Sequence, residues 1–186
     1  MTINGARVLA VIPARGGSRR VPRKNIKFFK GRPLIGWTID AARSSRLIDK
    51  TVLSTEDAEI KLAALKLGAE VIDRPGYLAT DTAANEDVMR HALTVYPAYD
   101  WVVLLQPCSP LRQSADIDAC LALAADGDCI CISVRENGTK NGAVYVMKSA
   151  LLERGHNFNS NRLDTVWYWM PDARSLDIDD PEDFNA

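Results

Sequence analysis

The residues best suited to chemistry lie in a basic loop near the start of the chain. Residues 8–12 form an apolar run that ends at Pro13, and two glycines, a serine and five cationic side chains follow within residues 14–25. Free backbone N–H groups beside clustered positive charge suit a polyanion. Beyond the carboxyl end of a strand, that polyanion is typically a nucleotide phosphate. The loop therefore predicts a nucleotide-handling protein.

Other interpretations stay open on these residues alone. A solvated turn has the same composition, and a run of cations can form a stripe that binds nucleic acid. The loop matches neither the Walker A pattern nor Gly-x-Gly-x-x-Gly, so it supports neither a P-loop ATPase nor a dinucleotide-binding domain. Because the net charge is −1 and the pI about 6.1, the positive charge is local, which favours a small anionic ligand over nucleic acid.

A second candidate site lies near the other end of the sequence, at Asp177 and Asp179. In an extended segment, residues i and i+2 point the same way, with Cα atoms about 6–7 Å apart. Two carboxylates on one face can hold a hydrated divalent cation. A polar turn leading into a final helix that starts at Asp180-Pro181 is the alternative interpretation of the same spacing.

Length and composition predict one compact domain over residues 1–186. Hydrophobic residues make up 47% of the chain and charged residues 25%, as is usual for a globular protein. No apolar run approaches the roughly 20 residues of a membrane span, and residues 1–5 lack a signal-peptide layout. We therefore expect a cytoplasmic protein without a membrane partner. The four cysteines lack metal-binding spacing and predict reduced core thiols: Cys108, Cys120, Cys129 and Cys131.

Apolar strands alternate with amphipathic helices along the sequence. Expected strands are 8–12, 51–54, 70–72, 101–106, 129–134, 143–147 and 166–169; expected helices are 34–44, 58–67, 85–95, 114–124 and 149–154. Gly68 is expected to end the second helix, and Ser114 to cap the fourth. This alternation predicts a three-layer α/β/α sandwich with a mainly parallel sheet. Ligands bind beyond the carboxyl ends of such strands, so the basic loop, 54–57, 106–112 and 177–179 are expected to converge.

With these segments identified, the chain closely resembles the CMP-sialic acid synthetases, or acylneuraminate cytidylyltransferases, a family that also includes enzymes for pseudaminic, legionaminic and other nonulosonic acids. The matching motifs occur in the family's order: VIPARGGS (11–18) with Pro22, Lys24 and Asn25, LST (53–55), RP (74–75), LATDTA (78–83), LLQP (104–107), SPLR (109–112), NGAVY (141–145) and SLDID (175–179). The resemblance implies a Rossmann-like nucleotidyltransferase fold of the GT-A-like type.

The resemblance also implies roles for individual residues. The activity would be transfer of CMP from CTP to a sialic-acid-like sugar acid, with release of pyrophosphate, in surface-glycan synthesis. Arg15, Lys24, Asp177 and Asp179 would be catalytic, the two aspartates by holding Mg²⁺. The nucleotide would contact Ala14, Arg15, Gly16, Gly17, Ser18, Lys24, Asn25, Arg74, Ala83 and Asn85. The sugar would contact Gln106, Ser109, Asn141 and Tyr145.

One departure from the family concerns the sugar half. Between Val134 and Asn141 the family carries an insertion that reaches a partner subunit and adds basic residues near the sugar, whereas here only residues 135–140 fill the gap. The homodimer, the sugar acid and its carboxylate contacts are therefore open, with Arg135 or Lys140 as candidate replacements or as solvated loop residues. A non-catalytic nucleotide-binding or regulatory homologue and a sugar-phosphate nucleotidyltransferase are the alternative functions.

Overall fold

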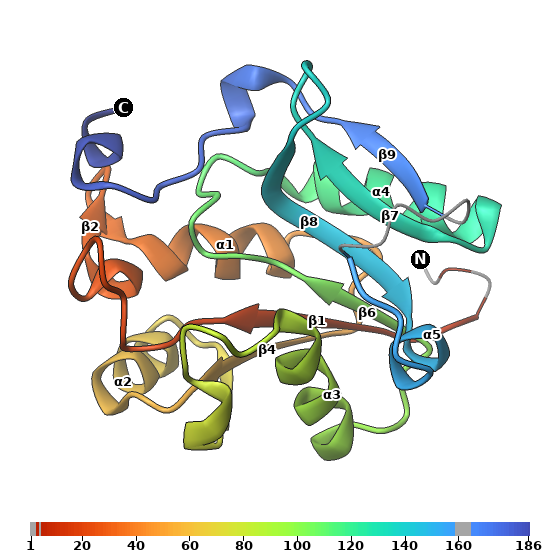
Figure 1. Ribbon diagram of the computed structural model, residues 1–186, viewed down its shortest axis with the longest axis horizontal. Helices are drawn as coiled ribbons and strands as arrows, with labels where there is room; N and C mark the ends of the chain where they lie inside the picture. Colours follow the sequence, from red (N-terminus) through yellow and green to blue (C-terminus); the bar gives the residue numbers. More distant parts are fainter. Residues whose placement is uncertain (1–2, 4, 159–164) are drawn as a thin grey trace.

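A seven-stranded sheet forms the centre of the protein (Figure 1). The computed structural model describes residues 3, 5–158 and 165–186. Within these residues the strand order is β5-β4-β1-β6-β8-β7-β9. The strands are β1 (Val8–Pro13), β4 (Lys50–Thr55), β5 (Glu70–Asp73), β6 (Trp101–Leu104), β7 (Ile130–Val134), β8 (Lys140–Lys148) and β9 (Thr165–Trp169). All neighbouring pairs are parallel except those of β8, which runs antiparallel to β6 and β7. The predicted, mainly parallel sheet is confirmed.

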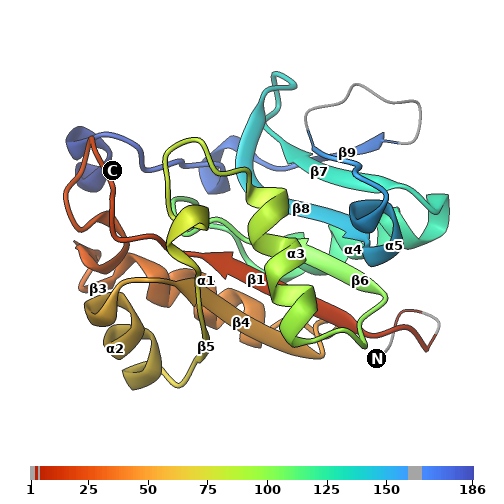
Figure 2. The same cartoon turned by 60° about the horizontal axis from the view of Figure 1, so that its bottom comes forward.

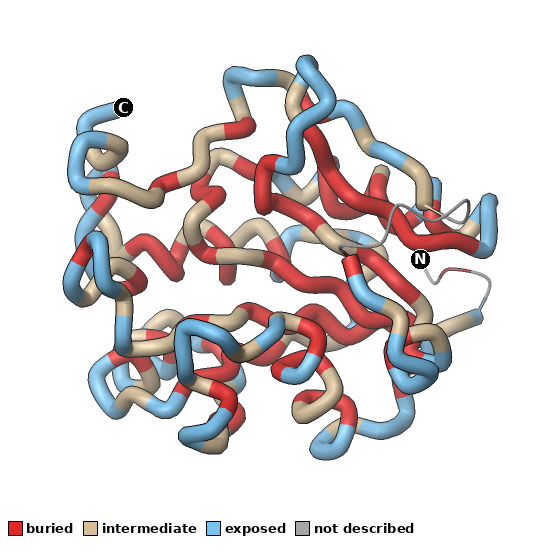
Figure 3. Tube along the Cα trace, viewed as in Figure 1, coloured by how far each residue is buried: buried red, intermediate tan, exposed pale blue. Residues whose placement is uncertain are grey.

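The central strands are apolar on both faces because helices cover both sides. On one face, α1 (Leu34–Arg43), α2 (Ala58–Lys66) and α4 (Ser114–Gly127) pack against alternate residues of the strands. On the other face, α3 (Asn85–Val95) and α5 (Ser149–Glu153) pack against the intervening residues. Figure 2 shows α3 in front of the sheet with α1 behind it, and Figure 3 shows the buried stretches following the strands. The three-layer α/β/α sandwich is therefore confirmed.

Local chemistry sets the ends of these elements. Asp57 caps α2 by accepting hydrogen bonds from the amides of Glu59 and Ile60, and Gly68 follows the helix at φ +75°, as predicted. The expected cap at Ser114 is wrong: Gln113 is the N-cap of α4, and Asp116 accepts the Gln113 amide at 2.9 Å. A carboxylate three residues inside the helix thus binds the backbone amide of the N-cap residue, which is the reciprocal bond of a capping box.

Strand β6 ends two residues earlier than predicted. The Leu105 amide still donates to the Val11 carbonyl at 3.0 Å, but the chain then turns at Gln106-Pro107. Because proline has no N–H for the ladder, the pairing with β1 stops there. Residues 106–112 consequently form a loop beyond the strand's carboxyl end, and residues 106–108 of this loop line a cavity.

A small hairpin and three of the four short helices are absent from the sequence prediction, whereas the last of these helices begins where the sequence placed a final helix, at Asp180-Pro181. The hairpin joins β2 (Phe28–Phe29) to β3 (Arg32–Pro33). The 3-10 helices are η1 (Lys24–Ile26), η2 (Gly76–Leu78), η3 (Asp172–Arg174) and η4 (Pro181–Asn185). The ring of Phe184 in η4 contacts that of Phe29, with centroids 6.3 Å apart. This packing places the end of the chain beside the hairpin that follows the basic loop (Figure 1).

The cysteines were expected to be reduced thiols in the core, and no helix was expected to span a membrane. All four cysteines lie outside disulfides, and three are buried, but Cys108 is only half-buried and lines a cavity, so the prediction of core thiols is wrong for that residue. None of the helices in the described part of the chain has the length and apolar character needed to cross a bilayer.

Candidate active site

A cavity of about 590 Å³ lies at the carboxyl ends of β1, β5 and β6, and the basic loop, residues 106–108 and the two aspartates converge on it as predicted, whereas residues 54–57 do not line it. Ten predicted site residues line it: Arg15, Ser18, Lys24, Asn25, Arg74, Ala83, Asn85, Gln106, Asp177 and Asp179. They come from segments up to 164 residues apart in the sequence, as the separation of Arg15 and Asp179 shows. The structure thus brings the nucleotide, sugar and metal candidates of the prediction to one cavity, and their individual roles stay predictions.

The basic loop is closely folded at its glycines. A Cβ atom built on Gly16 would lie 2.5 Å from an Asp57 carboxylate oxygen, a distance that no side chain tolerates. The side-chain amide of Asn25 closes the loop by donating to the Arg15 carbonyl at 2.9 Å. Gly17 has open space around its Cα atom. Glycine is therefore required at position 16 because the loop approaches the start of α2.

Two backbone amides of this loop already have partners. The Ala14 amide donates to the Ser54 carbonyl at 3.0 Å, and Ala14 is fully buried. The Gly16 amide donates to a Glu56 carboxylate oxygen at 2.7 Å. Neither amide faces a ligand in this conformation, so the predicted contact through Gly16 requires Glu56 to give way.

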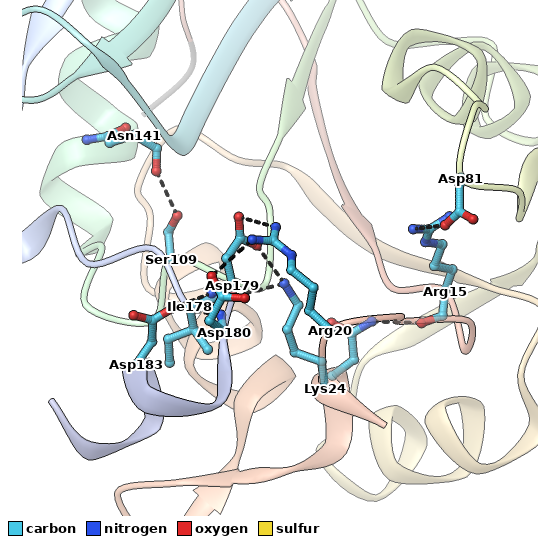
Figure 4. Close-up of polar contacts among 11 residues, drawn as sticks. Arg15, Arg20, Lys24, Asp81, Ser109, Asn141, Ile178, Asp179, Asp180 and Asp183 are labelled. Carbon is cyan, nitrogen blue, oxygen red and sulfur yellow. Dashed lines mark hydrogen bonds and ion pairs between the residues drawn. The ribbon is translucent and has the colours of Figure 1, made fainter. Parts of the chain in front are cut away.

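Carboxylates hold the cationic side chains on one side of the cavity. Asp81 accepts from Arg15 at 2.6 Å through one oxygen and pairs with Arg19 through the other. The Arg15 and Asp81 side chains are 31% and 33% exposed, so ligand can reach the pair. The pair is drawn in Figure 4. A carboxylate thus sits on the guanidinium that we predict binds phosphate.

A second group of ion pairs forms around Asp179. One of its oxygens accepts from Lys24 Nζ at 3.0 Å, and the other accepts from Arg20 Nη2 at 2.7 Å (Figure 4). Lys24 Nζ also donates to the Ile178 carbonyl at 2.9 Å. Burial would raise the pKa of Asp179, but the hydrogen bonds from Lys24 and Arg20 outweigh it and lower that pKa. Asp179 is therefore held as a carboxylate.

Asp177 has a different environment from Asp179. Its Oδ1 atom is buried without a hydrogen-bond partner among the described residues. Burial raises its pKa, and the adjacent Cys108 thiol and the Lys24 ammonium oppose that increase. A carboxylate oxygen that is buried and unpaired is costly, and a ligand that supplies positive charge removes the cost.

Asp177 and Asp179 together form a candidate site for a divalent cation. Both line the cavity, while the Ile178 side chain between them is fully buried against Phe29 and Leu34, so the expected alternation holds. No cluster of three potential ligands occurs among the described histidines, cysteines and acidic residues. Mg²⁺ commonly takes one or two carboxylates and completes its shell with water and substrate phosphates. The donor set and the orphaned Asp177 oxygen fit Mg²⁺.

Arg74 is a buried residue that lines the cavity. Its guanidinium donates to the Ser54 carbonyl at 2.7 Å and to the Ser54 hydroxyl at 3.2 Å. Burial lowers the pKa of Arg74 to about 10, although the Glu56 carboxylate opposes the decrease. Arg74 therefore fixes the end of β4 against the segment that carries Leu78 and the predicted nucleotide contacts.

On the sugar side, Gln106 lines the cavity, whereas Ser109, Asn141 and Tyr145 are not among its lining residues. Ser109 and Asn141 are fully buried. Asn141 accepts from the Ser133 hydroxyl at 2.7 Å and donates to the Ser175 hydroxyl at 3.0 Å, while Ser109 donates to the Asn141 carbonyl at 3.2 Å. Both side chains join the segments behind the cavity and are buried in this conformation, so their contact with the sugar stays a prediction.

The remaining sugar candidates lie closer to the cavity. Gln106 lines it, and a Cβ atom on Gly142 would lie 2.7 Å from Gln106 Oε1, so β8 approaches Gln106 closely. Tyr145 is half-buried and stacks at a tilt against Phe158, with centroids 5.0 Å apart. Burial raises the pKa of Tyr145 to about 12, with Cys108 and Asp177 contributing. Tyr145 is therefore a neutral phenol near Asp177.

Arg135 and Lys140, the two candidates for binding the sugar carboxylate, differ in whether they already have a partner in the protein. Lys140 Nζ donates to the Phe158 carbonyl and so already has a partner. The half-buried Arg135 guanidinium has no hydrogen bond or ion pair with the described residues, yet it is near enough to Asp177 to lower the pKa of that carboxyl. Of the two, Arg135 is the one available to an anion.

Several cavity residues were given no role from the sequence. Arg19 and Arg20 belong to the basic loop, and Asp81 belongs to the LATDTA motif. Only the structure shows that Arg19 pairs with Asp81 and that Arg20 pairs with Asp179. Charge alternation between two distant segments is too weak a signal to predict such pairs. Leu78, Thr80, Val88, Pro107 and Cys108 also line the cavity.

The fold and the site define a nucleotidyltransferase-like α/β protein, and the sequence match gives the family. Residues 9–166 match the family described as Cytidylyltransferase, to which this chain therefore belongs. The chain is 30% identical to an N-acylneuraminate cytidylyltransferase of Escherichia coli O18:K1:H7, over 96% of its own length and 50% of that protein. It is 43% identical to a pseudaminic acid cytidylyltransferase of Campylobacter jejuni, over 55% and 47% of the two chains. The resemblance to the CMP-sialic acid synthetases is confirmed.

Solved structures support the same fold. A CMP:2-keto-3-deoxy-manno-octonic acid synthetase complexed with CTP superimposes with a TM-score of 0.78 at 16% identity, covering 95% of each chain. A cytidylyltransferase from Leptospira borgpetersenii gives 0.74 at 22% identity, covering 96% of this chain and 84% of the other. The chain spans about half the length of the curated relatives named above, so its own activity is a separate question.

Proposed function

We propose that this protein is a Mg²⁺-dependent cytidylyltransferase. It transfers CMP from CTP to the anomeric hydroxyl of a sialic-acid-like (nonulosonic or other 2-keto-3-deoxy) sugar acid and releases pyrophosphate. The observation that carries the proposal is the single cavity that gathers Arg15, Lys24, Asp177 and Asp179. We place the protein in the cytoplasm, as one step of surface-glycan synthesis.

The reaction requires mainly position and charge. The sugar hydroxyl attacks the α-phosphorus, and pyrophosphate leaves roughly in line. Arg15 and Lys24 orient the triphosphate and offset the charge that develops on the leaving pyrophosphate. Phosphate oxygens replace the Asp81 carboxylate as the partner of Arg15. They likewise replace the Glu56 carboxylate as the acceptor of the Gly16 amide.

The metal and the sugar complete the reactive arrangement. Asp177 and Asp179 would hold Mg²⁺, which offsets charge on phosphate oxygens and lowers the pKa of the attacking hydroxyl when bound. Gln106 lines the sugar end of the cavity. Arg135 is our candidate for the sugar carboxylate because its guanidinium lacks a protein partner among the described residues.

The test is pyrophosphate release from CTP and Mg²⁺ with a panel of 2-keto-3-deoxy sugar acids. We expect release with at least one acid, none when Mg²⁺ is chelated, and slower release when UTP or dTTP replaces CTP. CTP binding without release from any acid would instead support a non-catalytic nucleotide-binding homologue. Faster turnover of UTP or dTTP, with sugar phosphates as acceptors, would support a sugar-phosphate nucleotidyltransferase.

A further inference from the structure

Arg20 forms an ion pair with Asp179, one of the two carboxylates that we assign to the metal. Its Nη2 atom lies 2.7 Å from Asp179 Oδ2 and its Nη1 atom 3.1 Å from Asp180 Oδ2, so one guanidinium bridges two adjacent carboxylates (Figure 4). Lys24 takes the other Asp179 oxygen. Both oxygens of Asp179 are therefore bound to protein cations, and a divalent cation competes with these cations for the carboxylate.

The two cations differ in how easily they can leave. The Lys24 side chain is 17% exposed, and its ammonium is also held by the Ile178 carbonyl at 2.9 Å. The Arg20 side chain is 57% exposed, and its partners among the described residues are the carboxylates of Asp179 and Asp180. An exposed ion pair is weak and readily exchanged. Arg20 is therefore the partner that a metal ion displaces.

We propose that Arg20 is a positioning residue that blocks the metal carboxylate until nucleotide arrives. This inference rests on the proposed function. In the empty protein Arg20 neutralises Asp179 and Asp180. When the cation binds with CTP, Arg20 leaves Asp179, because the cation and the guanidinium repel each other at that carboxylate, and its guanidinium turns to the triphosphate. Metal and nucleotide binding are thereby coupled through one side chain.

The segment that carries Asp179 does not depend on Arg20 for its shape. The Asp183 carboxylate accepts the amides of Asp179 and Asp180, each at 2.8 Å. The Ile178 amide donates to the Cys108 carbonyl at 2.7 Å, and the Ile178 side chain is buried. Replacing Arg20 therefore removes a charge and two ion pairs without releasing the backbone, so the variant isolates the blocking role.

The experiment measures Mn²⁺ affinity of the whole protein with and without CTP, by the electron paramagnetic resonance signal of free Mn²⁺. We expect Arg20→Gln to bind Mn²⁺ alone about 5- to 10-fold more tightly than the parent, since one opposing charge and one competing donor are lost. CTP should then strengthen Mn²⁺ binding less in Arg20→Gln than in the parent, because the coupling free energy between the two ligands is smaller. Arg20→Lys, which keeps the charge but replaces the planar guanidinium fork with a shorter side chain and a single nitrogen, should be intermediate.

Arg23→Gln is the matched control. Arg23 lies on the same loop and carries the same charge, but it pairs with Asp57 and Glu59. It should change the Mn²⁺ affinity less than about 2-fold. Equal or weaker Mn²⁺ binding by Arg20→Gln, or an equal gain in Arg23→Gln, would overturn the role of Arg20 while leaving the proposed function standing. Absence of Mn²⁺ binding to the parent, with and without CTP, would overturn both.

Discussion

The backbone amide of Ile178 donates a 2.7 Å hydrogen bond to the carbonyl of Cys108. This contact joins the segment that carries the two aspartates to the loop that follows β6 and carries Gln106. The buried Arg112 side chain connects the same loop to β8, by donating to the Gln106 carbonyl at 3.2 Å and to the Ala143 carbonyl at 2.8 Å. The metal and sugar candidates are therefore positioned by one connected piece of backbone.

Asp177→Asn should separate activity from stability. The substitution removes a carboxylate that we assign to the metal, so we expect turnover to fall at least 10³-fold. It also removes a buried, unpaired charge, so the free energy of unfolding of the ligand-free protein should rise by about 1 kcal/mol. Urea titration and pyrophosphate release measure the two effects. Unchanged turnover would contradict the metal assignment.

Lys24→Gln should mainly slow the chemical step. The ammonium lies between Asp179 and the Ile178 carbonyl at the edge of the cavity, where it can offset charge on the leaving pyrophosphate. We expect kcat to fall about 10²- to 10³-fold, as when a charge-stabilising donor is lost from other active sites. Steady-state kinetics at saturating CTP is the measurement. A change confined to the KM for CTP would mean that Lys24 only binds the ground state.

Arg135 should recognise the carboxylate of the sugar acid. With the preferred acid, Arg135→Gln should raise KM about 10- to 100-fold, the loss expected for a charge-assisted hydrogen bond, and leave the KM for CTP unchanged. Lys140→Gln is the control because the Lys140 ammonium is bound to the Phe158 carbonyl. The parent should prefer the acid to its carboxamide, and Arg135→Gln should lose that preference. A retained preference argues against Arg135.

Asp116 should stabilise the protein above the acid range. It is fully buried and accepts from Arg174 at 2.7 and 3.1 Å and from the Tyr168 hydroxyl at 2.9 Å. Burial would raise its pKa, but the Arg174 hydrogen bonds and other donors outweigh burial and lower it. We therefore expect Asp116→Asn to cost about 2 kcal/mol at pH 7.

The sign of the pH effect follows from that lowered pKa. A carboxylate whose pKa is lower in the folded state contributes stability above its unfolded pKa, about 3.9, and loses it as the pH falls through the folded value. The difference between Asp116→Asn and the parent should therefore be full at pH 7 and shrink below about pH 4. Asp126→Asn, at an exposed position on the same helix, serves as control. A difference independent of pH would contradict the assignment.

The sequence predicted the layers and the convergence of the site because both follow from local patterns. Strands such as β1 and β6 are continuous apolar runs, and parallel strands end at one edge, which is why the segments that carry Arg15 and Gln106 were expected to meet. The hairpin of β2 and β3 has two residues in each strand, which is too short for a period to be recognised. The burial of Ser109 and Asn141 depends on their contacts with each other and with Ser175, which no local pattern encodes.

The central claim is CMP transfer, and detection of the product tests it most directly. The intact protein is incubated with CTP, Mg²⁺ and the acid panel, and mass spectrometry and ³¹P nuclear magnetic resonance follow the products. We predict a CMP-linked sugar acid and pyrophosphate in equal amounts, with neither formed by Asp177→Asn. Pyrophosphate without a CMP-sugar, or no product from any acid although CTP and Mn²⁺ bind, would contradict the claim.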